Sequence, residues 1–192
     1  MAVFPIFLKL AGRRVLVVGG GPVAASKLRA LLDAEAQVTV VAPEVEAEID
    51  AAPVEVQRRP FEPSDLDGVS FVVAAAPPDV NRAVSAAAHP RGLFVNAVDD
   101  MESASAYLGG VVRRDGFTIA ISTDGEAPAL AGLVREALEQ VLPDDLDAWM
   151  AQAKEARREW LARGVPMERR RPMLLDALVA LYESRGRQTE TV

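Results

Sequence analysis

Three consecutive glycines between two apolar segments constrain the fold of this chain more than any other feature. The apolar, largely β-branched segment 14–18 predicts a strand, and the apolar positions from Ala24 to Leu32 fall on one face of a helix. Residues 37–41 predict a second strand, so a βαβ unit closes within the roughly 30 residues that such a unit needs. A right-handed parallel pair of strands in one sheet is therefore expected.

The alternation of strand and helix continues along the first half of the chain. Further strands are predicted at 54–57, 69–76 and 92–98, and residues 80–88 have the composition of a helix. Residues 69–76 are a nearly continuous apolar run, which is typical of a strand covered on both faces. Strands that alternate with helices predict an α/β fold with a Rossmann-like, doubly wound parallel sheet.

The pattern changes after residue 105. Two extended segments, 107–113 and 117–122, are separated by Arg114, Asp115 and Gly116, and an Asp-Gly pair in that position predicts a β-hairpin. Pro128 opens a helical segment with leucine and valine at i, i+3, i+4 and i+7 spacing. This apolar stripe must pack against another surface.

Two more helices are predicted after residue 144, the second of them beginning at Pro172. The chain is therefore expected to have three domains. These are a Rossmann domain at 1–105, a small region with the hairpin and one helix at 106–143, and a helical C-terminal domain at 144–192.

The segment from Gly19 to Ala24 fits the pattern G-x-G-x-x-A, directly after a strand and at the start of a helix. In that context the first glycine permits a tight turn, and the third lets backbone N–H groups approach a pyrophosphate. A glycine turn without a ligand is the alternative. The second strand leads into Pro43 and Glu44 rather than ending in an acid, which leaves ribose recognition open. No arginine stands there to bind a 2′-phosphate, so the sequence favours NAD over NADP.

Composition excludes several classes of protein. The chain has no cysteine and one histidine, His89, which excludes disulfides, thiol catalysis and metal sites built from cysteine or several histidines. A net charge of −7 argues against nucleic-acid binding. The Tyr-x-x-x-Lys pair of short-chain dehydrogenases is missing after both tyrosines. With neither a signal segment nor a membrane-length apolar run, a cytoplasmic location away from membranes is expected.

Two adjacent carboxylates, Asp99 and Asp100, follow the fifth predicted strand. In open α/β sheets, ligands bind outside the carboxyl ends of the strands, so these residues are the best candidates for a catalytic base. A solvated turn or a helix cap is the alternative.

The chain resembles the precorrin-2 dehydrogenase and sirohydrochlorin ferrochelatase family of siroheme synthesis, which includes the N-terminal part of siroheme synthase. The resemblance covers nearly the whole chain. It is carried by residues 4–8, 15–24, Lys27, 80–81, 96–99 and 119–128. It implies a homodimer that uses NAD to oxidise precorrin-2 to sirohydrochlorin, and it allows Fe²⁺ to be inserted afterwards. A non-catalytic NAD-binding sensor or regulatory module is the alternative function.

The resemblance also implies roles for individual residues. Asp99 matches the family's functional aspartate and would be the catalytic base. The residues expected to bind the cofactor are Gly19, Gly20, Gly21, Pro22, Val23, Ala24, Glu44, Ala75, Ala76 and Val98. Those expected to bind the carboxylate-rich tetrapyrrole are Asn96, Arg113, Arg114, Ser122, Arg169, Arg170 and Arg171. No resident metal ion is expected.

Overall fold

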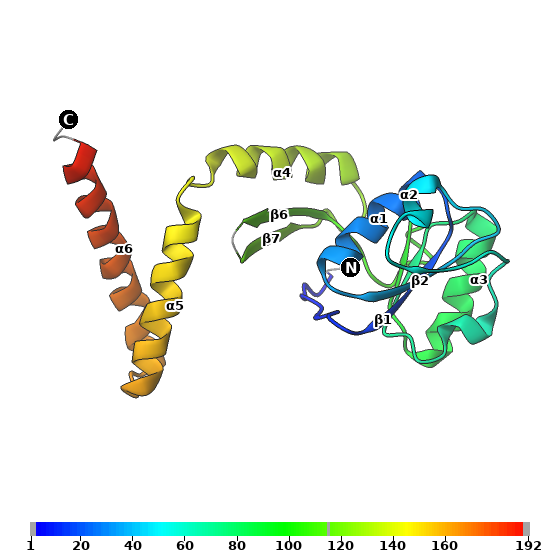
Figure 1. Ribbon diagram of the computed structural model, residues 1–192, viewed down its shortest axis with the longest axis horizontal. Helices are drawn as coiled ribbons and strands as arrows, with labels where there is room; N and C mark the ends of the chain where they lie inside the picture. The colour runs from blue at the N-terminus through cyan, green and yellow to red at the C-terminus, as the bar shows by residue number, and fades with distance from the viewer. Residues whose placement is uncertain (1–2, 115, 190–192) are drawn as a thin grey trace. The chain divides into compact units, whose positions relative to one another are not determined.

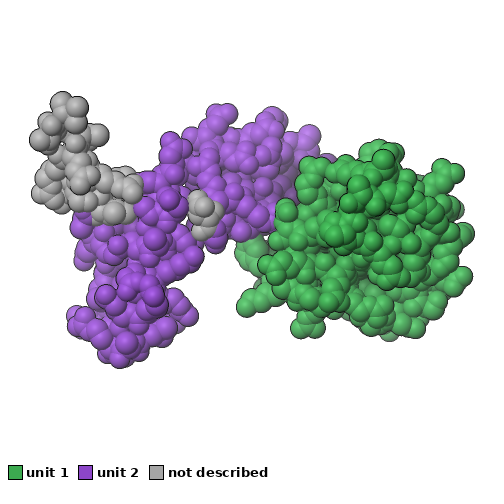
Figure 2. Space-filling view, in the orientation of Figure 1, with its two compact units in different colours: residues 1–108, 124–126 green, residues 109–123, 127–192 purple. Residues whose placement is uncertain are grey.

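The computed structural model describes residues 3–114 and 116–189, so Asp115 of the predicted hairpin turn lies outside the described residues. The chain forms two compact units (Figure 2). The first runs to residue 108 and includes 124–126, and the second holds 109–123 and the chain from residue 127 onward. The division into three domains at residues 105 and 143 stays a prediction.

A five-stranded parallel sheet forms the centre of the first unit (Figure 1). The strands are β1 (Arg14–Val18), β2 (Gln37–Val41), β3 (Glu55–Gln57), β4 (Phe71–Ala74) and β5 (Val95–Ala97). Their order across the sheet is β3-β2-β1-β4-β5. The predicted doubly wound parallel sheet is confirmed.

Helices cover both faces of this sheet because successive strand residues point to opposite sides. Val17 of β1 packs with Leu28 of α1 (Pro22–Asp33), and the short helix α2 (Ala47–Asp50) adds Ile49 to the same cluster. Leu16 of β1 packs on the other face with Val84 of α3 (Pro78–Ala88). The sheet is therefore buried on both faces, as the continuous apolar strands predict.

Strand β4 is shorter than the apolar segment 69–76 that predicts it. The N–H of Ala75 still donates to the carbonyl of Val18, at 2.8 Å. The N–H of Ala76 donates instead to the side chain of Asn81, at 3.0 Å. Pairing with β1 therefore stops at Ala74, and the two alanines after it form a loop.

The second unit begins with an antiparallel hairpin and a helix. The hairpin joins β6 (Gly110–Arg114) to β7 (Phe117–Ile121), and α4 (Pro128–Val141) packs on it. A Cβ on Gly110 would lie 2.9 Å from the carbonyl oxygen of Ala131, so glycine permits this close approach. The first arm starts at Gly110 rather than at 107, because the pairing with β7 begins there.

Helices α5 (Leu146–Ala162) and α6 (Met167–Thr189) lie side by side in the rest of this unit (Figure 1). The prediction that the last helix begins at Pro172 is wrong, because α6 begins at Met167 and contains this proline. Pro172 lies in the second turn and removes one backbone hydrogen bond. The side chain of Arg170 donates twice to the carbonyl of Val165, which stabilises the start of the helix.

A charged pair closes the short 3₁₀ turn at Pro63–Leu66 in the first unit. The Arg59 guanidinium donates to both carboxylate oxygens of Asp65, at 2.5 and 2.9 Å, and this bond lowers the pKa of Asp65 below its ordinary value. Because the folded-state pKa is the lower one, ionised Asp65 stabilises the fold above the unfolded-state value of about 3.8. This contribution is lost as the pH falls through the folded-state pKa.

Replacing Asp65 by asparagine is therefore expected to lower the urea midpoint of unfolding at neutral pH. The difference from the unaltered chain is expected to shrink at a pH below the ordinary pKa of aspartate. Urea titrations at about pH 7 and pH 3 measure both differences. Equal differences at the two pH values would contradict this account of the pair.

Candidate functional site

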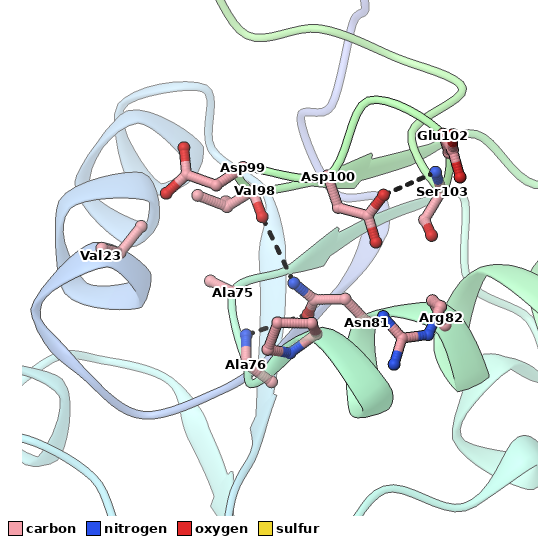
Figure 3. A pocket seen from close by; sticks show the side chains of 11 residues that line it. Val23, Ala75, Ala76, Asn81, Arg82, Val98, Asp99, Asp100, Glu102 and Ser103 are labelled. Carbon is pink, nitrogen blue, oxygen red and sulfur yellow. Dashed lines mark hydrogen bonds between the residues drawn. The ribbon is translucent and has the colours of Figure 1, made fainter.

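A pocket of about 440 Å³ opens at the carboxyl ends of β4 and β5 (Figure 3). Helices α1 and α3, which follow the neighbouring strands β1 and β4, cover opposite faces of the sheet. Such a reversal is the topological switch point at which open α/β sheets bind ligands. The pocket is lined by Val23, Ala75, Ala76, Pro78, Asn81, Arg82, Val98, Asp99, Asp100, Glu102 and Ser103.

The three glycines before α1 have different tasks. Gly19 has a φ of +121°, and a Cβ there would overlap the carbonyl oxygen of Ala75. A Cβ on Gly20 would overlap the carbonyl oxygen of Glu44. A Cβ on Gly21 would meet no atom within 4 Å. The first two glycines are therefore required by the fold, whereas the third leaves space open for a ligand.

The N-terminus of α1 is suited to an anion. Gly21 is its N-cap residue and provides no side-chain cap, and Pro22 in the first turn has no N–H group. The N–H groups of Val23 and Ala24 lie in the first turn, where a helix has no internal acceptors, and the helix dipole adds partial positive charge. With the open space at Gly21, this arrangement fits the pyrophosphate of a dinucleotide.

Asp99 is exposed and lies on the wall of the pocket, two residues after β5 ends. The N–H of Val98 still donates to the carbonyl of Ala74, at 2.9 Å. The backbone then turns, and Asp99 has a φ of +56°, in the left-handed region that non-glycine residues seldom occupy. Such conformations gather at functional sites, where surrounding contacts hold them.

Asp100 differs from its neighbour. Its Oδ1 accepts the backbone N–H of Ser103, at 3.0 Å, and so closes a turn. Hydrogen bonds from the Ser103 side chain and N–H, with the charge of Arg82, lower the pKa of Asp100. A carboxylate held in its ionised form is a weak base. Asp100 is therefore better described by the alternative to a catalytic base, a residue that closes a turn.

The pocket brings together six of the residues considered from the sequence: Val23, Ala75, Ala76, Val98, Asp99 and Asp100. The glycines adjoin it through the contact of Gly19 with Ala75. Glu44 follows β2 with an exposed side chain. The sequence-based site omitted the other five lining residues: Pro78, Asn81, Arg82, Glu102 and Ser103. Asn81 could have been found from the sequence, because it falls on the same helical face as Val84 and Ala88, where an apolar residue is expected. The exposed Arg82 and Glu102 follow no pattern that indicates a site.

The seven residues predicted to bind the tetrapyrrole do not line this pocket as the structure describes it. Asn96 is buried in β5, where its Nδ2 donates to the carbonyl of Ala106 at 3.0 Å. The other six belong to the second unit, and Ser122 is exposed directly after β7.

The five arginines in that set fall into two groups. Arg114 donates to the carbonyl of Glu139 at 2.8 Å, and Arg170 donates to that of Val165. Arg113, Arg169 and Arg171 are exposed. The guanidinium groups of Arg114 and Arg170 therefore have partners within the fold.

Neither a metal centre nor a membrane helix is found in the described part of the chain. Among residues 3–114 and 116–180, whose side chains the structure describes, no three histidine, cysteine, aspartate or glutamate side chains are grouped so that they could hold a metal ion. No helix in the same ranges has the length and apolar character that crossing a membrane requires.

Fold and pocket define a Rossmann-type dinucleotide-binding protein. Comparison with family models matches residues 6–110 to a family described as "Putative NAD(P)-binding" and residues 114–140 to the sirohaem biosynthesis protein central region. The chain therefore belongs to this NAD(P)-binding family, and its segment 114–140 resembles the sirohaem biosynthesis protein central region. The predicted resemblance is confirmed, and so is a nicotinamide dinucleotide as the cofactor.

Individual relatives agree with this family. The chain is 41% identical to siroheme synthase 1 of Aeromonas salmonicida over 89% of its own length and 38% of the relative. It is 43% identical to the siroheme synthase of Chromobacterium violaceum over 74% of its length and 32% of that protein. The chain thus spans less than two fifths of these relatives. Among solved structures, SirC, a precorrin-2 dehydrogenase, is 28% identical with a TM-score of 0.72, over 91% of this chain and 88% of SirC.

Proposed function

We propose that this chain is an NAD-dependent dehydrogenase that oxidises precorrin-2 to sirohydrochlorin. The observation that carries the proposal is the pocket in which Asp99 and the start of α1 meet at the switch point of the sheet. The likeness to SirC along most of both chains supports this substrate. A sensor that only bound NAD would not need a carboxylate beside the glycine loop, residues 19–21.

Each part of the site has a task in this reaction. NAD⁺, when bound, supplies the acceptor for the hydride that precorrin-2 loses. Asp99 accepts the proton that leaves as the conjugation of the macrocycle extends, so the substrate loses two electrons and two protons in all. Gly21 and the N–H groups of α1 hold the pyrophosphate. Glu44 binds a ribose hydroxyl and would repel a 2′-phosphate, which favours NAD over NADP.

The exposed arginines of the second unit are the proposed anchors for the substrate's carboxylates. Arg113, Arg169 and Arg171 are exposed, and arginine recognises carboxylates through paired N–H donors. Arg114 and Arg170 are weaker candidates because backbone carbonyls already accept from them.

We further infer that the enzyme works in the cytoplasm, where the nicotinamide cofactor pool is available.

An anaerobic assay with precorrin-2 and NAD⁺ tests the proposal. NADH absorbance and the sirohydrochlorin spectrum should rise together and in equal amounts with catalytic amounts of protein. NAD binding without turnover would establish the sensor and overturn the dehydrogenase. Heat-inactivated protein is the control for oxidation that the protein does not catalyse.

We propose insertion of Fe²⁺ into sirohydrochlorin as a second reaction at the same site. Metal insertion displaces two protons from the macrocycle nitrogens, and the exposed carboxylate of Asp99 could accept a proton in this step too. Adding Fe²⁺ after the oxidation should give the metallochlorin spectrum faster with protein than without it. Equal rates would show that the chain is a dehydrogenase alone.

We infer a homodimer from the apolar face of α4. Leu130, Leu133, Val134 and Val141 are exposed on this helix, although its spacing predicts a buried stripe. Replacing Leu133 by aspartate would place a charge in the proposed contact, so a dimer of the 20.5 kDa chain should become a monomer. Light scattering after gel filtration measures the mass. Leu161→Asp on α5, which also changes an exposed leucine, should remain dimeric; a dimeric Leu133→Asp protein would contradict the assignment.

A further inference from the structure

We infer that Asn81 is a positioning residue that orients Asp99 and the glycine loop together. This inference rests on the proposed function, because it concerns the same cofactor and the same base. Asn81 lies in the first turns of α3 and is 2% exposed. It is separate from Asp99 in sequence, but both line the pocket (Figure 3).

Both polar groups of the Asn81 side chain bind backbone. Its Oδ1 accepts the N–H of Ala76 at 3.0 Å, and its Nδ2 donates to the carbonyl of Val98 at 3.4 Å. A buried amide is unfavourable unless such bonds are made, so the side chain is held between the loops that follow β4 and β5. Asn81 therefore connects the two loops just beyond the backbone hydrogen bond from the N–H of Val98 to the carbonyl of Ala74.

The bond to Val98 acts on Asp99. The carbonyl that accepts it belongs to the peptide group joining Val98 to Asp99, so the bond fixes the plane from which the φ of Asp99 is measured. That φ is +56°, in the left-handed region that residues other than glycine seldom occupy, and surrounding contacts hold such conformations. Loss of the Nδ2 donor would let this peptide group rotate and would carry the Asp99 carboxylate away from its position.

The bond to Ala76 acts on the glycine loop. The N–H that donates it belongs to the peptide group joining Ala75 to Ala76, and the carbonyl oxygen of that same group lies against Gly19. Fixing this plane fixes the surface on which the glycine turn rests. The acceptor of Asn81 thus supports cofactor binding, and its donor supports the base.

Two substitutions separate these two effects. Asn81→Leu removes both bonds at similar volume. Asn81→Asp keeps an acceptor for Ala76 but presents no donor to Val98 when it is ionised, so assays at about pH 8 are appropriate. Val84→Ala is the matched control, because Val84 lies one turn further along α3 and is fully buried in the core. It should lower stability without removing either hydrogen bond of Asn81.

We expect kcat and the Kd for NAD⁺ to respond differently in the two variants. Asn81→Leu should lower kcat by about 10–100-fold, the cost of a misplaced reacting group, and raise the Kd for NAD⁺ by about fivefold. Asn81→Asp should lower kcat similarly while its Kd for NAD⁺ stays within about twofold. Val84→Ala should keep both values near those of the unaltered enzyme. Calorimetric titration with NAD⁺ gives Kd, and the precorrin-2 assay gives kcat.

The outcomes distinguish this inference from the proposed function. Absence of turnover in the unaltered protein would overturn the dehydrogenase, whatever the variants do. Turnover in the unaltered protein and unchanged kcat in Asn81→Asp would overturn the positioning of Asp99. Parallel losses in Val84→Ala and Asn81→Leu, in step with their melting temperatures, would show that Asn81 acts through stability alone.

Discussion

Replacing Asp99 by asparagine is expected to lower the kcat for precorrin-2 oxidation by about 10²–10⁴-fold, the usual contribution of a general base. Asparagine has nearly the same shape and also tolerates a positive φ, so the turn after β5 should persist. The Kd for NAD⁺ should change little, since the glycine loop and α1 are untouched. Stopped assays that quantify NADH and calorimetric titration with NAD⁺ measure the two quantities separately.

Asp100→Asn is the control for this experiment. Asp100 lies in the same pocket, but its carboxylate closes the turn with Ser103 and its pKa is lowered. An asparagine oxygen can still accept the N–H of Ser103, so kcat should fall only a few-fold. Full turnover by the Asp99→Asn enzyme, or an equally large loss in Asp100→Asn, would show that the base is assigned to the wrong carboxylate.

Replacing Gly21 by valine is expected to raise the Kd for NAD⁺ by at least about tenfold while leaving the melting temperature unchanged. The backbone at Gly21 has a φ of −83°, which valine can adopt, and its Cβ would point into open space. The added methyl groups would occupy the space proposed for the pyrophosphate. An unchanged Kd would contradict the role assigned to the glycine loop.

Gly20→Ala supplies the opposite result. Its Cβ would overlap the carbonyl of Glu44, and overpacking of this kind costs about 1–3 kcal/mol. The melting temperature should therefore fall by several degrees, since a chain of this size loses about 2–4 °C per kcal/mol. Differential scanning calorimetry of both variants checks that the adjacent glycines serve different purposes.

The sequence was sufficient to predict the sheet because its signals are local. A β-branched run, three glycines and an amphipathic segment define β1, the turn and α1 within about 20 residues, as the context of this motif requires. The place of Asp99 and Asp100 could also be predicted, since residues after a strand end lie at the edge where ligands bind, and the family resemblance then favoured Asp99. The parallel direction of the strands follows from the helical crossovers that join them.

Side-chain partners across the fold could not be predicted in the same way. The sequence does not show that Arg114 donates to a carbonyl of α4, or that Arg170 closes the turn before α6. Both look like their exposed neighbours in the chain. Asn81 is similar, because its two partners lie 5 and 17 residues away and meet only when β4 and β5 pair.

The close contact between Gly19 and Ala75 limits how this protein can evolve. The atoms that exclude a larger residue at Gly19 belong to the main chain, which every amino acid carries. A second mutation elsewhere cannot make room by shortening a side chain, so suppressors of a Gly19 substitution should not be found at neighbouring positions. Of the three glycines, Gly21 is then the position most open to change, because a Cβ there would meet no atom within 4 Å.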